Sequence, residues 1–134
     1  PDGPGPSQFS ILHAIRVSSD GLVYVADREN RRVQVFTVEG EFVRQVVRRT
    51  SPFARNLALS PDPQQQFLYV GGSAEILVLD RETLGEVTSI RGGGVLGGGH
   101  QMATDSKGNI YTAQTGQRRA QKYTFQGLSA GDGR

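Results

Sequence analysis

The sequence of 134 residues contains no cysteine. It can therefore hold neither a disulfide framework nor a thiolate metal site, and the redox compartment stays open. No run approaches the roughly 20 apolar residues that a bilayer-spanning helix needs, so we expect no membrane contact. The formal net charge of +2 is too small to indicate a nucleic-acid-binding protein by itself.

The amino terminus also lacks the charged and apolar regions of a signal peptide. Three of its first six residues are prolines, which suit neither a helix nor an apolar segment. We expect a periplasmic or secreted protein only if a signal peptide precedes residue 1.

What the sequence does contain is one unit written three times, at residues 20–25, 62–70 and 105–112. Each copy begins with an aspartate and runs through a turn into alternating apolar residues with a tyrosine. The aspartates, at positions 20, 62 and 105, recur with a period in the low forties. A repeat of this length with alternating apolar residues is typical of a propeller blade. Helical repeats would instead carry apolar residues at i, i+3, i+4 and i+7.

Turn residues divide the units into strands. The first unit predicts strands at residues 13–18, 22–26, 33–37 and 41–47. The second predicts strands at residues 56–60, 67–70, 76–80 and 86–90, and the third at residues 100–104, 109–113 and 120–125. The sequence after residue 127 predicts no fourth strand, although four antiparallel strands make one blade.

Residues 25–36, from Val25 to Phe36, resemble the NHL repeat, and residues 105–113 with 118–123 resemble it more loosely. The resemblance implies an all-β fold, a β-propeller of NHL type with about three four-stranded antiparallel blades. That is half of a six-bladed ring, and its last blade lacks the outer strand. We expect one propeller segment over residues 1–134, with blades at 9–48, 53–91 and 98–128, a flexible linker at 92–99 and a flexible tail at 129–134.

A narrower resemblance lies in residues 9–13, 26–30 and 53–56. These pieces are similar to bacterial relatives of peptidyl-α-hydroxyglycine α-amidating lyase, a zinc-dependent NHL propeller that releases a peptide amide and glyoxylate. The resemblance implies that His13 and His100 are zinc ligands. It also implies that Arg28 lies at the active site and that Arg28 and Arg55 bind substrate.

Both histidines open an inner strand, and they stand two blades apart. A third ligand two blades further round would complete a tripod with an open position for water or substrate. Gln101 stands where the lyase pattern has an acidic residue, so we do not expect calcium. The lyase's catalytic tyrosine and second arginine have no counterpart in these three blades, which leaves enzyme activity open.

A plainer interpretation of each residue stays open beside the functional one. The histidines can be satisfied by neighbouring carbonyls, and Arg28 can pair with Glu29 or Asp27 at the surface. The repeated aspartates, Asp20, Asp62 and Asp105, are expected to shape the blade turns. The aromatic and large apolar residues of the repeat are expected to pack between blades; they are Tyr24, Phe36, Tyr69, Leu79, Tyr111 and Tyr123.

Three functions follow, in this order. The first is a binding or interaction scaffold for a peptide or protein, and the second is part of a zinc-dependent lyase-like enzyme. The third is an RNA-binding surface through the arginine pairs at 31–32 and 118–119, ranked last because no aromatic residues are interleaved with them. Three blades do not close a ring, so we expect either self-association as a dimer or missing N-terminal blades.

Overall fold

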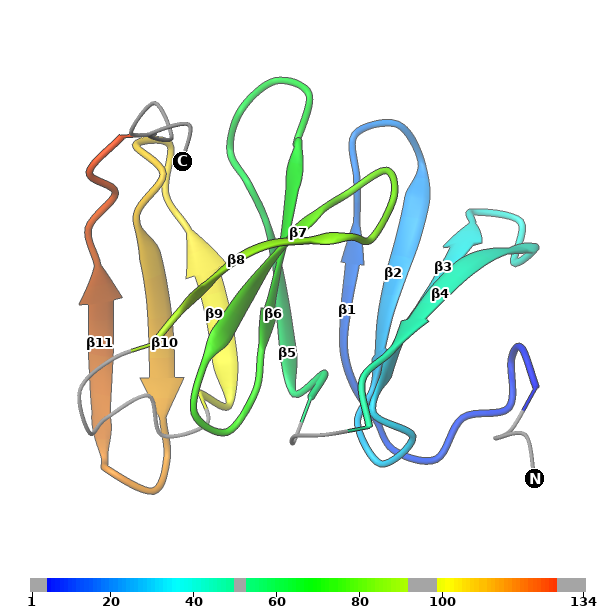
Figure 1. The fold of residues 1–134 in the computed structure, drawn as a ribbon, viewed down its shortest axis with the longest axis horizontal. Coiled ribbons are helices and arrows are strands. Elements are labelled where there is room, and N and C mark those ends of the chain that lie inside the picture. Colours follow the sequence, from blue (N-terminus) through cyan, green and yellow to red (C-terminus); the bar gives the residue numbers. More distant parts are fainter. Residues whose placement is uncertain (1–4, 50–52, 92–98, 128–134) are drawn as a thin grey trace, which may run out of the picture.

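The computed structural model describes residues 5–49, 53–91 and 99–127. These ranges contain eleven strands and no helix. None of the described segments could therefore cross a membrane as a helix. Figure 1 shows three twisted antiparallel sheets standing side by side, which confirms the predicted all-β architecture. The predicted flexible tail at 129–134 and all but the last residue of the predicted linker at 92–99 lie outside the described residues.

Each sheet is an antiparallel meander of consecutive strands. The first consists of β1 (Leu12–Val17), β2 (Leu22–Asp27), β3 (Arg32–Thr37) and β4 (Phe42–Val47). The second consists of β5 (Asn56–Leu59), β6 (Phe67–Gly71), β7 (Ile76–Asp80) and β8 (Glu86–Ile90). The third consists of β9 (Gln101–Thr104), β10 (Ile110–Gln114) and β11 (Arg119–Tyr123). All eleven strands lie within two residues of their predicted bounds.

The repeated aspartates shape the turn between the first two strands of each sheet, as expected. Asp20 and Asp62 each accept a hydrogen bond from a serine hydroxyl two residues earlier. Asp105 accepts from the backbone N–H groups of Lys107 at 2.9 Å and Asn109 at 3.0 Å. Hydrogen bonds from the side chains of Asn109 and then Tyr111 help to lower the pKa of the Asp105 carboxyl to about 2. The charged form of Asp105 is thus part of the turn.

The hydrophobic core lies between the sheets rather than within one of them. Apolar residues of the first and second sheets form one cluster, and those of the second and third sheets form another. Four of the six residues predicted to pack between blades are buried, namely Tyr24, Phe36, Tyr69 and Leu79. Strand β5 contacts both β1 and β9, so the first strands of the three sheets run together along one side of the molecule.

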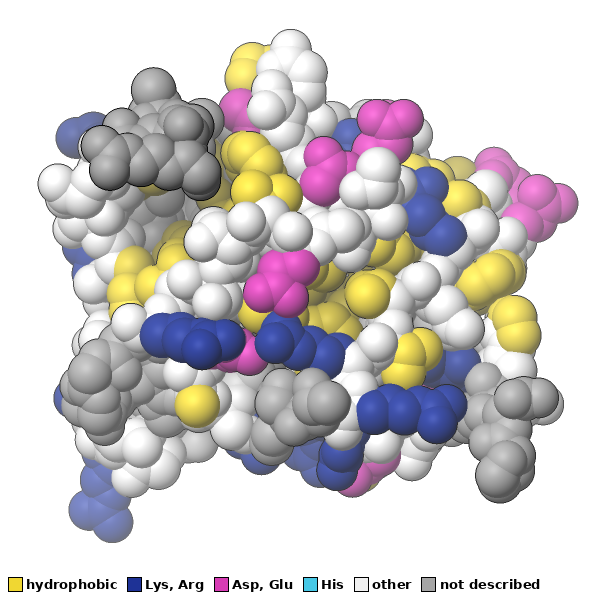
Figure 2. Space-filling view, in the orientation of Figure 1, with side chains coloured by type: hydrophobic (Ala, Val, Ile, Leu, Met, Phe, Trp, Pro, Cys, Tyr) yellow, Lys and Arg dark blue, Asp and Glu magenta, His cyan; other side chains and the backbone are white. Residues whose placement is uncertain are grey.

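Ion pairs add to the contact between the first two sheets. Arg48, which follows β4, lies 3.5 Å from the Glu75 carboxylate and 3.3 Å from that of Glu86. Within the second unit, Arg91 lies 2.9 Å from Glu75. Lys and Arg side chains predominate across the lower half of the face shown in Figure 2, with a few acidic side chains among them. Glu86 and Arg91 are 47% and 69% exposed, and we expect the pair that each of them forms to contribute at most about 1 kcal/mol.

The three sheets align residue by residue through their pairing register. The repeat tyrosine of β2, β6 and β10 pairs with Arg16, Ala58 and Ala103 of the neighbouring first strand. Three positions before those partners along the chain stand His13, Arg55 and His100, so all three lie at the head of the first strand of their sheet, although a bulge leaves His13 itself outside the pairing. A backbone hydrogen bond repeats at the last two: Arg55 N–H donates to Gly71 at 2.9 Å, and His100 N–H to Ala113 at 2.6 Å.

The same alignment shows that the two end faces of the molecule are incompletely covered. Ile15 and Val17 of the first sheet are 58% and 59% exposed, whereas their equivalents in the second sheet, Leu57 and Leu59, are 0% and 9% exposed. At the other end, Tyr111 is 37% exposed, although Tyr24 and Tyr69 are buried. Tyr111 was predicted to pack between blades, and in the described residues no following blade is present to cover it.

Candidate functional site

At the heads of the three inner strands, β1, β5 and β9, lie His13, Arg55 and His100, which we call the mouth cluster. His13 is the extra residue of a β-bulge, because Leu12 pairs with Asp27 and Ala14 with Ala26. Bulges re-aim a side chain and are frequent next to sites. His13 and Arg55 are half-buried and His100 is exposed, so the cluster is accessible to a ligand.

The structure brings the two histidines together. Their ring centroids are 5.0 Å apart and the rings meet edge to face at 86°. The Nδ1 atom of His13 is hydrogen-bonded to the backbone carbonyl of Arg55. A carbonyl oxygen only accepts, so Nδ1 carries the hydrogen, and Nε2 is the ring atom whose lone pair is free in the neutral imidazole.

This arrangement fits part of a zinc site. Zinc-bound histidines almost always donate their second ring N–H to a carboxylate, carbonyl or water, as His13 does. Two histidine nitrogens that bind one zinc ion each lie about 2 Å from it, so the two rings must be close together. The contact between the rings of His13 and His100 meets this requirement. However, the described residues contain no group of three or more His, Cys, Asp or Glu side chains that could hold a metal. His13 and His100 would therefore need a further ligand from outside these residues.

Arg55 supplies the positive charge of the mouth cluster. Within the described residues its guanidinium makes no hydrogen bond, whereas its carbonyl fixes the ring of His13. A guanidinium fork matches a carboxylate in shape and charge. Arg55 precedes β5, which lies between β1 and β9, so a permanent cation is attached to the backbone that holds the His13 ring, and this suits an anionic group of a ligand.

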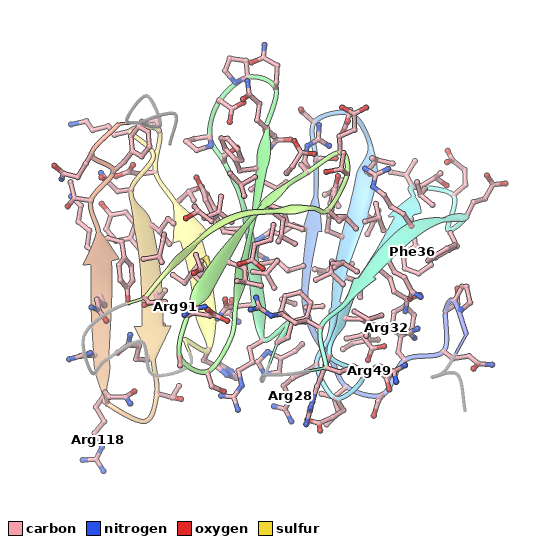
Figure 3. All side chains as sticks on the ribbon, in the orientation of Figure 1. Arg28, Arg32, Phe36, Arg49, Arg91 and Arg118 are labelled. Atoms are coloured by element: carbon pink, nitrogen blue, oxygen red, sulfur yellow. The ribbon has the colours of Figure 1, made fainter. Side chains whose placement is uncertain are left out.

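Arg28 forms the surface ion pair that was the alternative to a substrate-binding role. Its Nε donates to the Glu29 carboxylate at 2.8 Å, and the two side chains are 32% and 51% exposed. Figure 3 shows Arg28 near the lower edge of the molecule, at the turn between β2 and β3. No described contact joins Arg28 to either histidine, so the substrate role implied by resemblance gains no support from its surroundings.

Asn56 is a feature of the site that sequence reasoning missed. It is 2% exposed, its Nδ2 donates to the Gly99 carbonyl, and its Oδ1 has no partner in the described residues. A cavity of about 10 Å³ opens beside it, with Thr112 and Gln114 among its walls. That is close to the smallest volume that holds one water molecule. The sequence feature that could have identified Asn56 is its polar amide side chain at the start of β5, whose other residues are apolar.

Arg16 also went unnoticed in the sequence. Its guanidinium donates to the Met102 carbonyl at 2.9 Å and to the Ile15 carbonyl at 2.7 Å. The first bond joins β1 directly to β9, past the intervening β5. This bridge helps to hold the first and third sheets at the spacing that brings His13 and His100 into contact.

Comparison with known proteins agrees with the repeat pattern. The family model for the NHL repeat matches residues 9–36. Human NHL repeat-containing protein 3 is 51% identical over 35 residues, which are 26% of this chain and 10% of the relative. Peptidyl-glycine alpha-amidating monooxygenase B of Xenopus laevis is 51% identical over 45 residues, which are 32% of this chain and 5% of the relative. The aligned stretches are a small fraction of both relatives.

Solved structures agree with the sheet arrangement. Hydrazine synthase of Kuenenia stuttgartiensis superimposes with a TM-score of 0.63 at 18% identity, over 88% of this chain and 37% of that one. U3-55K superimposes with a TM-score of 0.65 at 14% identity, over 88% of this chain and 40% of that one. At such identities the likeness concerns the fold, and the matched portion is well under half of each neighbour.

Proposed function

Since the chain carries an NHL repeat and folds as a segment of a β-propeller, we propose that it is a binding scaffold whose ligand site is the mouth cluster. The observation that supports this proposal is the meeting of His13 and His100, whose rings are in contact. Arg55 lies at the head of β5, the strand between β1 and β9. The ligand group that suits them is a carboxylate, as found at the end of a peptide.

The binding test compares two short peptides that differ only at the C-terminus. An acetylated glycine tripeptide with a free carboxylate should move the imidazole NMR signals of His13 and His100, and its amide should not. Arg55→Gln should weaken the binding about tenfold or more, since a hydrogen bond to a charged group contributes about 1.5–3 kcal/mol.

The matched control is Arg118→Gln, which removes an arginine of the same charge from the β10–β11 turn. Figure 3 shows Arg118 projecting from that turn, away from the sheet. This variant should bind like the unchanged chain. Equal shifts with the amide, or equal losses in the two variants, would remove the carboxylate site.

The scaffold is proposed to be half of a six-bladed ring that a second copy completes. The exposed residues at one end, Ile15 and Val17, match positions that are buried in the second sheet, and Tyr111 at the other end matches buried tyrosines. Packing the third sheet of one copy on the first sheet of another would bury both surfaces. Each large side chain fully buried contributes about 1.5–3 kcal/mol.

A second candidate function is part of a zinc-dependent lyase-like site. The contact of the two rings and the Nδ1 hydrogen bond of His13 favour it. In this site His13 and His100 would hold the ion, which would supply Lewis acidity toward a substrate oxygen. The stretch shared with an amidating monooxygenase supports the same idea.

Zinc chloride alone tests the metal part of this candidate. We expect zinc to shift the ring signals of His13 and His100 together, because one ion must contact both. His13→Ala should abolish the shift at His100, whereas the control variant Arg28→Ala should leave it unchanged. A shift confined to one ring, or one that survives His13→Ala, would exclude a shared ion.

A further inference from the structure

Among the residues that the structure describes, the third sheet ends in a strand edge without a partner strand. The first two sheets have four strands each, and the third has three, with β11 at its margin. Within the described residues β11 pairs only with β10. An unpaired edge presents free backbone donors and acceptors and is a template for another strand.

The first sheet shows which backbone groups of β11 face outward. In the first sheet, Arg31 C=O accepts from Arg48 N–H and Thr37 N–H donates to Glu41 C=O, both at 2.9 Å, so the odd-numbered residues of β3 face β4. By the residue alignment their equivalents in the third sheet, including Ala120 and Lys122, face away from β10. These two residues supply the outward N–H groups of the free edge.

A wide apolar groove lies beside this edge, between the second and third sheets. Its volume is about 1100 Å³. The side chains that line it on the second sheet include Phe67, Val78 and Ile90, and those on the third include Ile110, Tyr123 and Phe125. Hydrophobic side chains are visible at the surface over this part of the molecule in Figure 2. The groove could accept side chains that project from one face of an added strand.

The charge of the third sheet indicates the kind of strand that fits. Residues 99–127 contain four basic side chains, Lys107, Arg118, Arg119 and Lys122, against one acidic side chain, Asp105. Asp105 is already engaged in its own turn. Residues 53–91, in contrast, contain more acidic than basic side chains. The surroundings of the β11 edge are therefore the basic part of the groove.

We propose that the β11 edge binds an extended acidic peptide, which adds as the fourth, antiparallel strand of the third sheet. Backbone hydrogen bonds to Ala120 and Lys122 give the peptide its direction, alternate apolar side chains enter the groove, and acidic side chains lie near Lys107 and Lys122. This mode of recognition takes affinity from the main chain and specificity from alternate side chains. It is separate from the mouth cluster and does not depend on it.

The test uses a seven-residue peptide of alternating glutamate and valine. Its binding should slow the amide hydrogen exchange of Ala120 and Lys122, and it should bind at least tenfold more tightly than the same peptide with lysine in place of glutamate. A peptide with proline at its centre should bind at least tenfold more weakly. His13 and His100 signals should stay unmoved, which separates this site from the carboxylate site.

Two variants of the chain sharpen the test. Ala120→Pro removes one outward N–H while leaving the ladder to β10 in place, and edge positions tolerate proline. It should weaken the peptide at least tenfold, as should Lys122→Glu, which keeps the backbone intact. The proposal is overturned if the exchange of Ala120 and Lys122 does not change at saturating peptide, if these amides are already protected in the free chain, or if the lysine peptide binds equally well.

Discussion

Asp27 and Arg32 form the most enclosed ion pair among the described residues. The Arg32 Nε lies 2.8 Å from the Asp27 carboxylate, and the side chains are 3% and 0% exposed respectively. Asp27 also accepts from Ser10 N–H at 3.0 Å and from Asn30 Nδ2 at 2.7 Å. Arg32 donates to the backbone carbonyls of Gly5 and Gln8, so the pair ties the N-terminal segment to the first sheet.

Removing one partner of this pair should be costly. Asp27→Ala leaves the Arg32 charge buried, and we expect a loss of about 3–5 kcal/mol in the free energy of unfolding. The matched variant is Arg28→Ala one residue along, which breaks the exposed pair with Glu29 and should cost at most about 1 kcal/mol. Urea unfolding of both variants gives the comparison, and similar losses would contradict this account of Asp27.

At the scale of single elements, the sequence predicted the strands because the turn chemistry is local. The Asp-Gly step at residues 20–21 places a glycine where the turn has a φ of +81°, and Gly108 recurs at +86° in the third unit. Alternation between such turns determines which residues face the neighbouring sheet. Tyr24 and Tyr69 therefore proved to be buried as expected.

The details of the site depend on which residues of neighbouring strands lie opposite one another, and the local sequence pattern does not determine this. The bulge at His13 is a shift of register between β1 and β2. No residue type at this place in the sequence predicts it. The role of Asn56 requires knowing that Gly71 lies opposite, where an added Cβ would come within 1.8 Å of the Asn56 Oδ1. Arg55 was found by resemblance, but the contact of its carbonyl with the His13 ring emerged only from the structure.

At the scale of the whole molecule, the two outer faces of the row of three sheets differ in the side chains that they expose. One end exposes Ile15 and Val17, and the other exposes Tyr111 with small residues around it, including Ala103 and Ala113. Every sheet buries the equivalent face wherever a neighbouring sheet is present. This contrast favours further blades at both ends, and a second copy offers a complementary surface to each.

Light scattering during size-exclusion chromatography, at several protein concentrations, tests this central claim most directly. We predict a mass near twice the 14.5 kDa of one chain. Ile15→Glu should shift that mass to one chain, because it places a charge in the interface, while its circular dichroism spectrum should stay unchanged. A monomer at every concentration for the unchanged chain would contradict ring closure by two copies.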